Sequence, residues 1–219
     1  MIKIVEVDKF KEVLFDGMSI MVGGFMTVGT SKLLIDAIVE SGVKDLTLYC
    51  NDAGYENEGI GRLIASGQCK KLIASHIGLN PQAQQLMNEN MMEVILVPQG
   101  TLVEQIRAGG SGLGGVLTPT GLGTLVEEGK DIINVDGKDY LLEKPLSADL
   151  TILEAYEADS FGNAKLIGTT KNFSPLMALA AKKVAIEVEN LRSVIDPNDV
   201  SIPGVLVDYV IREDVVNGR

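Results

Sequence analysis

Three short segments place polar or bare backbone groups directly after apolar runs, where a small molecule could bind. A glycine-rich turn at 23–29 follows the run 18–22, Asn51 and Asp52 follow 46–50, and Gln99 with Gly100 follows 93–97. Glycine lets a ligand approach main-chain N–H groups, whereas amide and carboxylate side chains supply hydrogen-bonding groups. The three segments together indicate a small-molecule site, although Asx turns and tight packing turns would use the same residue types.

A nucleophile or an acid–base pair is harder to find. Glu56 and Glu58 lie in a loop and are expected to be solvated, and His76 is expected to make a structural hydrogen bond. Arg107 is expected to pair with a helix neighbour. The GxGxxG match at 110–115 follows a helix instead of a strand, so it does not predict a dinucleotide site.

Metal chemistry has little support in the sequence. Cys50 and Cys69 are the two cysteines and His76 is the one histidine, too few to assemble a Cys/His zinc set. Cys50 lies in an apolar run and is expected to be a core thiol. We therefore expect no metal site, and a small-molecule site without its own nucleophile.

The elements that position these segments follow from hydrophobic periodicity. Strand and helix alternate four times in the first 110 residues, and continuous apolar strands joined by helices predict a parallel sheet covered on both faces. The carboxyl ends of such strands meet at one edge, so the three segments are expected to converge there. Strands are predicted at 18–22, 46–50, 71–75 and 93–97, and helices at 8–15, 31–42, 59–67, 80–90 and 101–110.

Local signals predict where several helices begin and end. Gly42 is a stop signal, and Asn80 followed by Pro81 is a typical helix start. Thr101 with Glu104 three residues later has the pattern of a capping box, which predicts that Gln99 and Gly100 form a turn.

The second half of the chain has a different organisation. Glycines crowd residues 109–124, too densely for regular structure, and Asp136-Gly137 predicts a β-hairpin near 132–142. Further strands are predicted at 148–155 and 184–190, with a helix at 174–182 between them that Ser174 caps. The predicted fold is a three-layer α/β/α domain over residues 1–219 with a mainly parallel open sheet and the hairpin as an appendage.

The charge and composition exclude several classes of function. The formal net charge of −11 disfavours nucleic acid and anionic membrane surfaces as partners. Hydrophobic residues make up 46% of the chain, yet no apolar stretch reaches transmembrane length and the first residues lack a secretory apolar region. These features favour a cytoplasmic protein.

Several motifs resemble family I coenzyme A transferases. "DGMSIMVGGFMTVGTS" is similar to the family's first signature, and "PQGTLVEQIRAGGSGLGGVLTPTGLGT" to its long middle segment. The stretches "ASHIGLNP", "DSFGNA", "KNFSPLMALAA" and "IPGVLVDYVI" follow in the family's order. The resemblance covers nearly the whole chain and is to the separate α subunits. Ser31 departs from the pattern, since the family signature usually has proline there.

The resemblance implies a division of labour between two chains. The family moves CoA from an acyl-CoA to a carboxylic acid such as acetate, butyrate or acetoacetate, through a glutamyl-CoA thioester on the β subunit. It implies no catalytic residue in this chain, no cofactor beyond CoA as a substrate, and an α2β2 or larger assembly. The CoA- and substrate-binding residues carried over are Gly23, Gly24, Phe25, Met26, Thr27, Val28, Gly29, Asn51, Asp52, Gln99 and Gly100.

The role of Asp52 and two alternative functions remain open at this stage. Asp52 stands where fused relatives often have asparagine, and a carboxylate there would repel an anionic substrate unless it is hydrogen-bonded. The same sheet architecture serves sugar-phosphate-binding and ligand-sensing domains, although lysine and arginine are sparse in the edge loops. A purely structural subunit is the second alternative function.

Overall fold

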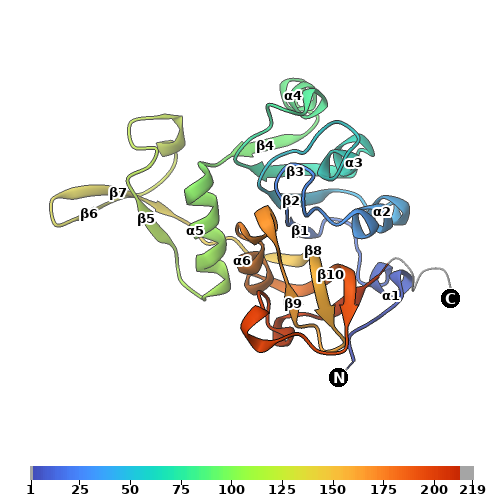
Figure 1. The fold of residues 1–219 in the computed structure, drawn as a ribbon. Helices are drawn as coiled ribbons and strands as arrows, with labels where there is room; N and C mark the ends of the chain where they lie inside the picture. Colours follow the sequence, from blue (N-terminus) through green and yellow to red (C-terminus); the bar gives the residue numbers. More distant parts are fainter. Residues whose placement is uncertain (1, 213–219) are drawn as a thin grey trace.

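A mainly parallel β-sheet lies at the centre of the computed structural model, which describes residues 2–212 (Figure 1). Its strands run in the order β11-β10-β8-β1-β2-β3-β4, each parallel to its neighbours, and β9 pairs antiparallel with β8. The bounds are β1 Ser19–Val22, β2 Leu46–Cys50, β3 Cys69–Ala74, β4 Glu93–Leu96, β8 Ala148–Asp159, β9 Ala164–Lys165, β10 Ala181–Arg192 and β11 Tyr209–Ile211.

The strand order places β1 in the middle of the sheet. The chain first builds outward from β1 through β2 and β3 to β4, and it later returns to the other side of β1 with β8, β10 and β11. The order therefore reverses between β1 and β8. In open α/β sheets the crevice outside the carboxyl ends of the strands at such a reversal is the usual ligand site. The strand order therefore predicts that a ligand binds near the turn that follows β1.

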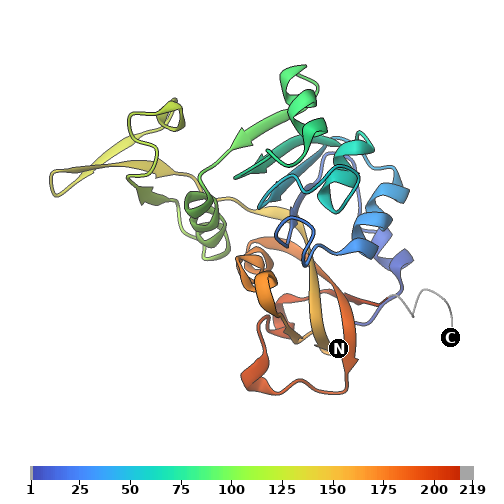
Figure 2. The ribbon, with the colours of Figure 1, turned by 45° about the horizontal axis from the view of Figure 1, so that its top comes forward.

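Helices cover both faces of the sheet, as Figure 2 shows with the sheet seen more nearly on edge. Alternate residues of β1 divide between two cores: Ile20 and Val22 pack with α1–α4, whereas Met21 packs with α5 and α6. Each fully buried Ile or Leu contributes about 1.5–3 kcal/mol. The helices are α1 Val7–Lys11, α2 Lys32–Ser41, α3 Ile60–Ala65, α4 Pro81–Asn88, α5 Gln99–Gly110 and α6 Ser174–Leu179. Short 3-10 turns are η1 Leu125–Glu127, η2 Gly168–Lys171, η3 Pro197–Asp199 and η4 Gly204–Leu206.

A small three-stranded antiparallel sheet projects from the body beyond α5 (Figures 1 and 2). It consists of β5 Val116–Thr118, β6 Ile132–Val135 and β7 Lys138–Glu143. The predicted hairpin is confirmed, because Asp136 and Gly137 between β6 and β7 both have positive φ angles, of 52° and 80°. The expectation that the glycine-rich segment lacks regular structure is wrong for β5, which pairs with β7.

The predicted three-layer architecture is confirmed, and so are several helix ends. Gly42 ends α2 in the left-handed conformation, and Asn80 caps α4 with Pro81 in its first turn. Ser31, which replaces the family's usual proline, is the N-cap of α2, and its Oγ accepts a hydrogen bond from the Leu34 N–H.

The predicted bounds of three helices are wrong. The first helix ends at Lys11 instead of residue 15, and Glu6 instead of Asp8 precedes it. Helix α5 begins at Gln99 after Pro98, so Thr101 caps nothing and the capping box with Glu104 does not form. Proline fixes φ near the value that a helix entry needs, which explains the earlier start. Helix α6 begins at Ser174 itself and ends at Leu179, because the following residues enter β10.

Candidate substrate-binding site

The 23–29 turn leaves β1 at the reversal point of the sheet. Phe25 and Val28 exchange two backbone hydrogen bonds of 3.0 Å, which makes the turn a miniature hairpin. The backbone at Met26 is left-handed (φ 56°), a conformation rare for residues other than glycine. The side chains of Phe25 and Val28 are exposed, by 44% and 57%, so the turn presents apolar groups to solvent.

Asp52 holds this turn from the neighbouring strand. Its Oδ2 accepts hydrogen bonds from the Met26 N–H and the Asn51 side-chain amide, both at 2.7 Å, and its Oδ1 accepts one from the Gly54 N–H at 2.7 Å. The last bond forms an Asx turn, which is one of the structural explanations that the sequence left open for this pair. The side chain is only 4% exposed. Its carboxylate is therefore engaged by protein donors, which answers the concern that it would repel an anionic substrate.

Asn51 is oriented by the same network. One N–H of its amide is directed to Asp52, and its backbone carbonyl accepts from the Ser75 N–H at 3.1 Å and from the Ser75 Oγ at 2.7 Å. The residue is 7% exposed. The turn after β1 and the loop after β2 thus form one hydrogen-bonded unit.

Gln99 and Gly100 lie apart from this unit. They form the first turn of α5 after the edge strand β4, and both are exposed. Within residues 2–212 no hydrogen bond joins either residue to the 23–29 turn or to Asn51 and Asp52. Gly100 instead lines, with Thr101 and Glu104, a hollow of about 480 Å³ whose other wall is β5. The convergence of all three segments therefore stays a prediction, whereas the contact of two of them is observed.

The segment 170–172 also packs against the 23–29 turn, although the sequence patterns gave it no role. The Asn172 amide donates to the Gly24 carbonyl at 3.2 Å, and a Cβ at Gly29 would lie 2.1 Å from the Thr170 methyl carbon. Phe25, Lys171 and Asn172 border a hollow of about 370 Å³ beside the turn. The signal in the sequence was the "KNFSPLMALAA" stretch, which the family resemblance included without giving it a role.

The other candidate groups have structural explanations. Glu56 and Glu58 are exposed, as expected of solvated loop residues, and Arg107 pairs with Glu104 at 3.0 Å. The His76 carbonyl accepts from the Ala53 N–H at 3.1 Å, so its structural hydrogen bond is made by the backbone while the ring is exposed.

Neither cysteine is suited to act as a nucleophile. Both thiols are free and buried. Burial raises the pKa of the Cys50 thiol well above its usual value and that of Cys69 to about 12. Among the residues described, no group of three or more His, Cys, Asp or Glu side chains could hold a metal ion. None of the described helices is both long and apolar enough to cross a membrane.

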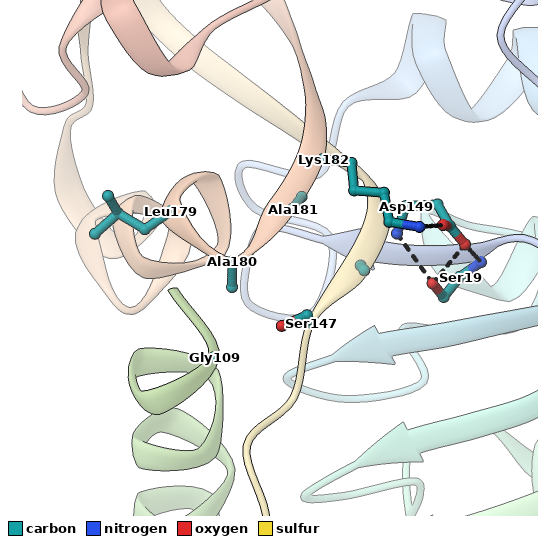
Figure 3. Close-up of a pocket in the computed structure, with 9 residues that line it drawn as sticks. Ser19, Gly109, Ser147, Asp149, Leu179, Ala180, Ala181 and Lys182 are labelled. Carbon is teal, nitrogen blue, oxygen red and sulfur yellow. Dashed lines mark hydrogen bonds and ion pairs between the residues drawn. The ribbon is translucent and has the colours of Figure 1, made fainter. Parts of the chain in front are cut away.

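Figure 3 shows a hollow at the amino ends of the strands, opposite the ends where the candidate site lies. It has a volume of about 440 Å³ and lies where β1, β8 and β10 begin. The Asp149 carboxylate accepts from the Ser19 N–H at 2.9 Å and Oγ at 2.8 Å, and pairs with Lys182 at 2.8 Å. Burial alone would raise the pKa of Asp149, but the hydrogen bonds from Ser19 and Lys182 together lower it below its usual value. These polar groups bond one another and so link the first residues of neighbouring strands. We therefore place the candidate site at the carboxyl ends of the strands instead.

Comparison with known proteins places this geometry in context. Residues 7–213 match the family described as Coenzyme A transferase. The chain is 51% identical to the acetoacetyl-CoA:acetate/butyrate CoA transferase alpha subunit of Clostridium acetobutylicum, over 96% of this chain and 98% of that one. It is also 51% identical to the acetate CoA-transferase subunit alpha of Escherichia coli K12, over 90% of each chain.

Solved structures support the fold. An acyl-CoA transferase of Escherichia coli O157:H7 superposes with a TM-score of 0.86 at 21% identity, covering 97% of this chain and 47% of that one. The present chain thus spans about half the length of that protein. Glutaconate coenzyme A-transferase of Acidaminococcus fermentans has a TM-score of 0.85 at 19% identity, covering 96% of this chain and 75% of that one.

Proposed function

This chain belongs to the coenzyme A transferase family as an α subunit, and from that premise we propose that it forms one wall of a site that moves CoA between a short-chain acyl-CoA and acetoacetate, acetate or butyrate. The observation that carries the proposal is the 51% identity over 96% of the chain to an α subunit named for those substrates. The network that ties the 23–29 turn to Asn51 and Asp52 supports it, because these are the residues that the resemblance assigns to the site.

The reactive carboxylate is proposed to come from the β subunit. A glutamate oxygen attacks the acyl-CoA carbonyl, the C–S bond breaks, and an acyl-glutamyl anhydride forms as the CoA thiolate leaves. The thiolate attacks the glutamyl carbonyl, releasing the first acid and leaving a glutamyl-CoA thioester, and the second acid takes over the CoA by the reverse steps. The burial of both cysteine thiols, which makes them unsuited to act as the nucleophile, agrees with this division.

The α chain's part is to position and stabilise. In this proposal the 23–29 turn contacts CoA through its backbone and its exposed apolar side chains, and the Gln99 amide donates to negative charge on a reacting carbonyl oxygen. Binding of the remote parts of CoA drives the reacting end into place. Asp52 does not contact the substrate in this proposal, and its role is to hold Met26 and Asn51 in position.

We propose further that the working enzyme is an α2β2 or larger cytoplasmic assembly that needs no cofactor beyond CoA as a substrate. The relatives are named as α subunits, which implies a β partner. Two free thiols suit a reducing compartment.

The decisive experiment is to express the chain with its β partner and to assay CoA transfer to acetate with acetoacetyl-CoA. The assembled enzyme should turn over, its β subunit should yield a borohydride-trapped glutamyl thioester, and the α chain alone should be inactive. Turnover by the purified α chain would overturn the proposal. Calorimetry that shows tight sugar-phosphate binding and none for CoA would instead favour a sensing domain.

One variant distinguishes a substrate-binding subunit from a purely structural one. Gln99→Ala in the assembled enzyme is expected to lower kcat by about 10²-fold, the usual loss for one donor to a developing oxyanion. The exposed Glu56→Gln is the matched control and should leave kcat unchanged. A Gln99→Ala enzyme with wild-type rate would favour the purely structural subunit.

A further inference from the structure

A carboxylate from a distant strand occupies the start of α2. Glu187, in β10, accepts two hydrogen bonds at the same oxygen: one from the Ser31 Oγ at 2.6 Å and one from the Leu33 N–H at 2.8 Å. The residues are more than 150 positions apart in the chain. The Ser31 Oγ in turn accepts from the Leu34 N–H at 3.3 Å. Glu187 and Ser31 together therefore form the N-terminal cap of the helix.

The place of this cap matters because α2 follows directly on the 23–29 turn. The first N–H groups of a helix lack internal partners, and a negative group placed beside them is stabilised by the helix dipole. The same N–H groups are what makes a helix start attractive to an anionic ligand. Here the protein's own Glu187 takes that position, just as Asp52 takes the Met26 N–H. Asp52 thus bonds the turn itself, and Glu187 bonds the start of the helix that follows the turn.

We propose that Glu187 is a positioning residue for substrate binding: by fixing the first turn of α2 it sets where the 23–29 turn faces the substrate, and it closes the α2 N-terminus to the phosphate groups of CoA. This inference rests on the proposed function, since it presumes that the turn contacts CoA. It also implies that the turn acts on the substrate through Phe25 and Val28 more than through the helix start.

The surroundings of Glu187 are acidic. Glu154 is its register partner on β8, and Glu189 follows two residues later on the same strand. Lys32, the first residue of α2, is exposed. Burial, with the neighbouring Glu187 and Glu189 carboxylates, raises the pKa of Glu154 to about 7. Glu154 is therefore mostly protonated below pH 7, where it adds little repulsion to Glu187 while Glu187 accepts both bonds.

The kinetic test compares three variants in the assembled α and β enzyme. Glu187→Ala removes both hydrogen bonds and is expected to lower kcat/KM for acyl-CoA at least tenfold, with KM raised. Glu187→Gln keeps an oxygen that can accept both bonds, so it should recover most of that loss. Glu189→Gln changes the same charge on the same strand without touching α2, and its kcat/KM should stay within twofold of wild type.

A second measurement does not depend on activity. Hydrogen–deuterium exchange of the chain should be at least tenfold faster at residues 24–34 in Glu187→Ala than in wild type, with little change in β2 and β3. A folded Glu187→Ala enzyme with wild-type kcat/KM overturns the inference, and so does equal loss in Glu187→Ala, Glu187→Gln and Glu189→Gln. If the wild-type enzyme itself lacks transferase activity, the proposed function fails. In that case the exchange rates at residues 24–34 test the cap separately, and unchanged rates in Glu187→Ala would contradict its role.

Discussion

Replacing Glu154 with glutamine should stabilise the protein at alkaline pH and leave it unchanged in acid. The side chain is partly buried on β8 opposite Glu187, and no hydrogen bond to its carboxyl is formed within the described chain. Burial raises its pKa from 4.5 to about 7, with the Glu187 and Glu189 carboxylates adding to the effect. The folded state thus favours the protonated form.

The sign of the pH dependence follows from proton binding. Between pH 4.5 and about 7 the unfolded chain has released this proton while the folded chain retains it, so rising pH favours unfolding. Below pH 4.5 both states are protonated and the residue costs nothing. Above pH 7 the folded state carries the full cost. The difference between 4.5 and about 7 corresponds to about 3.4 kcal/mol at 1.36 kcal/mol per pH unit, which solvent screening of a partly exposed group reduces to about 1–2 kcal/mol.

The assay is urea unfolding of wild type and Glu154→Gln at pH 4 and pH 8. Glutamine has the same shape and no charge, so the variant should be more stable by about 1–2 kcal/mol at pH 8 and by nothing at pH 4. In thermal melts the gain at pH 8 should amount to several degrees. Glu56→Gln, an exposed residue, should change stability by less than about 0.5 kcal/mol at either pH. An equal gain at both pH values, or none at pH 8, would refute the reasoning.

Three further outcomes follow from the same contacts. Asp52→Asn leaves one of three N–H donors without an acceptor and should lower the free energy of unfolding by about 1–3 kcal/mol in urea, with kcat/KM of the assembled enzyme falling too; unchanged values would show that Asp52 does not hold the turn. Gly29→Ala should destabilise the chain in thermal melts by more than Gly67→Ala, since both have left-handed backbone but only Gly29 would place its Cβ against Thr170; equal losses would contradict the close packing. Cys50 and Cys69 should react with an aromatic disulfide reagent only as fast as the chain unfolds, whereas rapid labelling of the native protein would contradict their burial.

The architecture of the first half of the chain was readable from local pattern. The helix that ends at Gly42 shows hydrophobic residues on one face and signals at both ends, and the structure gives it the bounds Lys32–Ser41. The run 46–50 is β2 residue for residue. Asp136-Gly137 predicted the hairpin because its two residues tolerate positive φ. Each of these signals acts within a few residues, so neighbouring sequence is enough to read it.

Helix boundaries were predicted wrongly where a second signal or a tertiary contact overrode the pattern that we used. Thr101 and Glu104 fit a capping box, yet Pro98 already fixes the entry to α5, and the helix begins two residues before Thr101. The end of α6 is similar: Ala180 to Lys182 continue a helical pattern, but pairing with β8 draws Ala181 onward into β10. Pro98 thus decided the start of α5, whereas pairing within the sheet decided the end of α6.

The sequence by itself determined the family, the alternation of strands and helices, and the candidacy of the 23–29 turn, Asn51 and Asp52. Only the tertiary structure showed that Asp52 bonds the turn, that Asn172 reaches Gly24, and that Glu187 caps α2. The physical reason is that hydrophobic pattern records how deeply a strand is buried and not which strand lies beside it. The placement of β8 next to β1 arises from contacts between residues more than a hundred positions apart, and a local reading of the chain has no access to them.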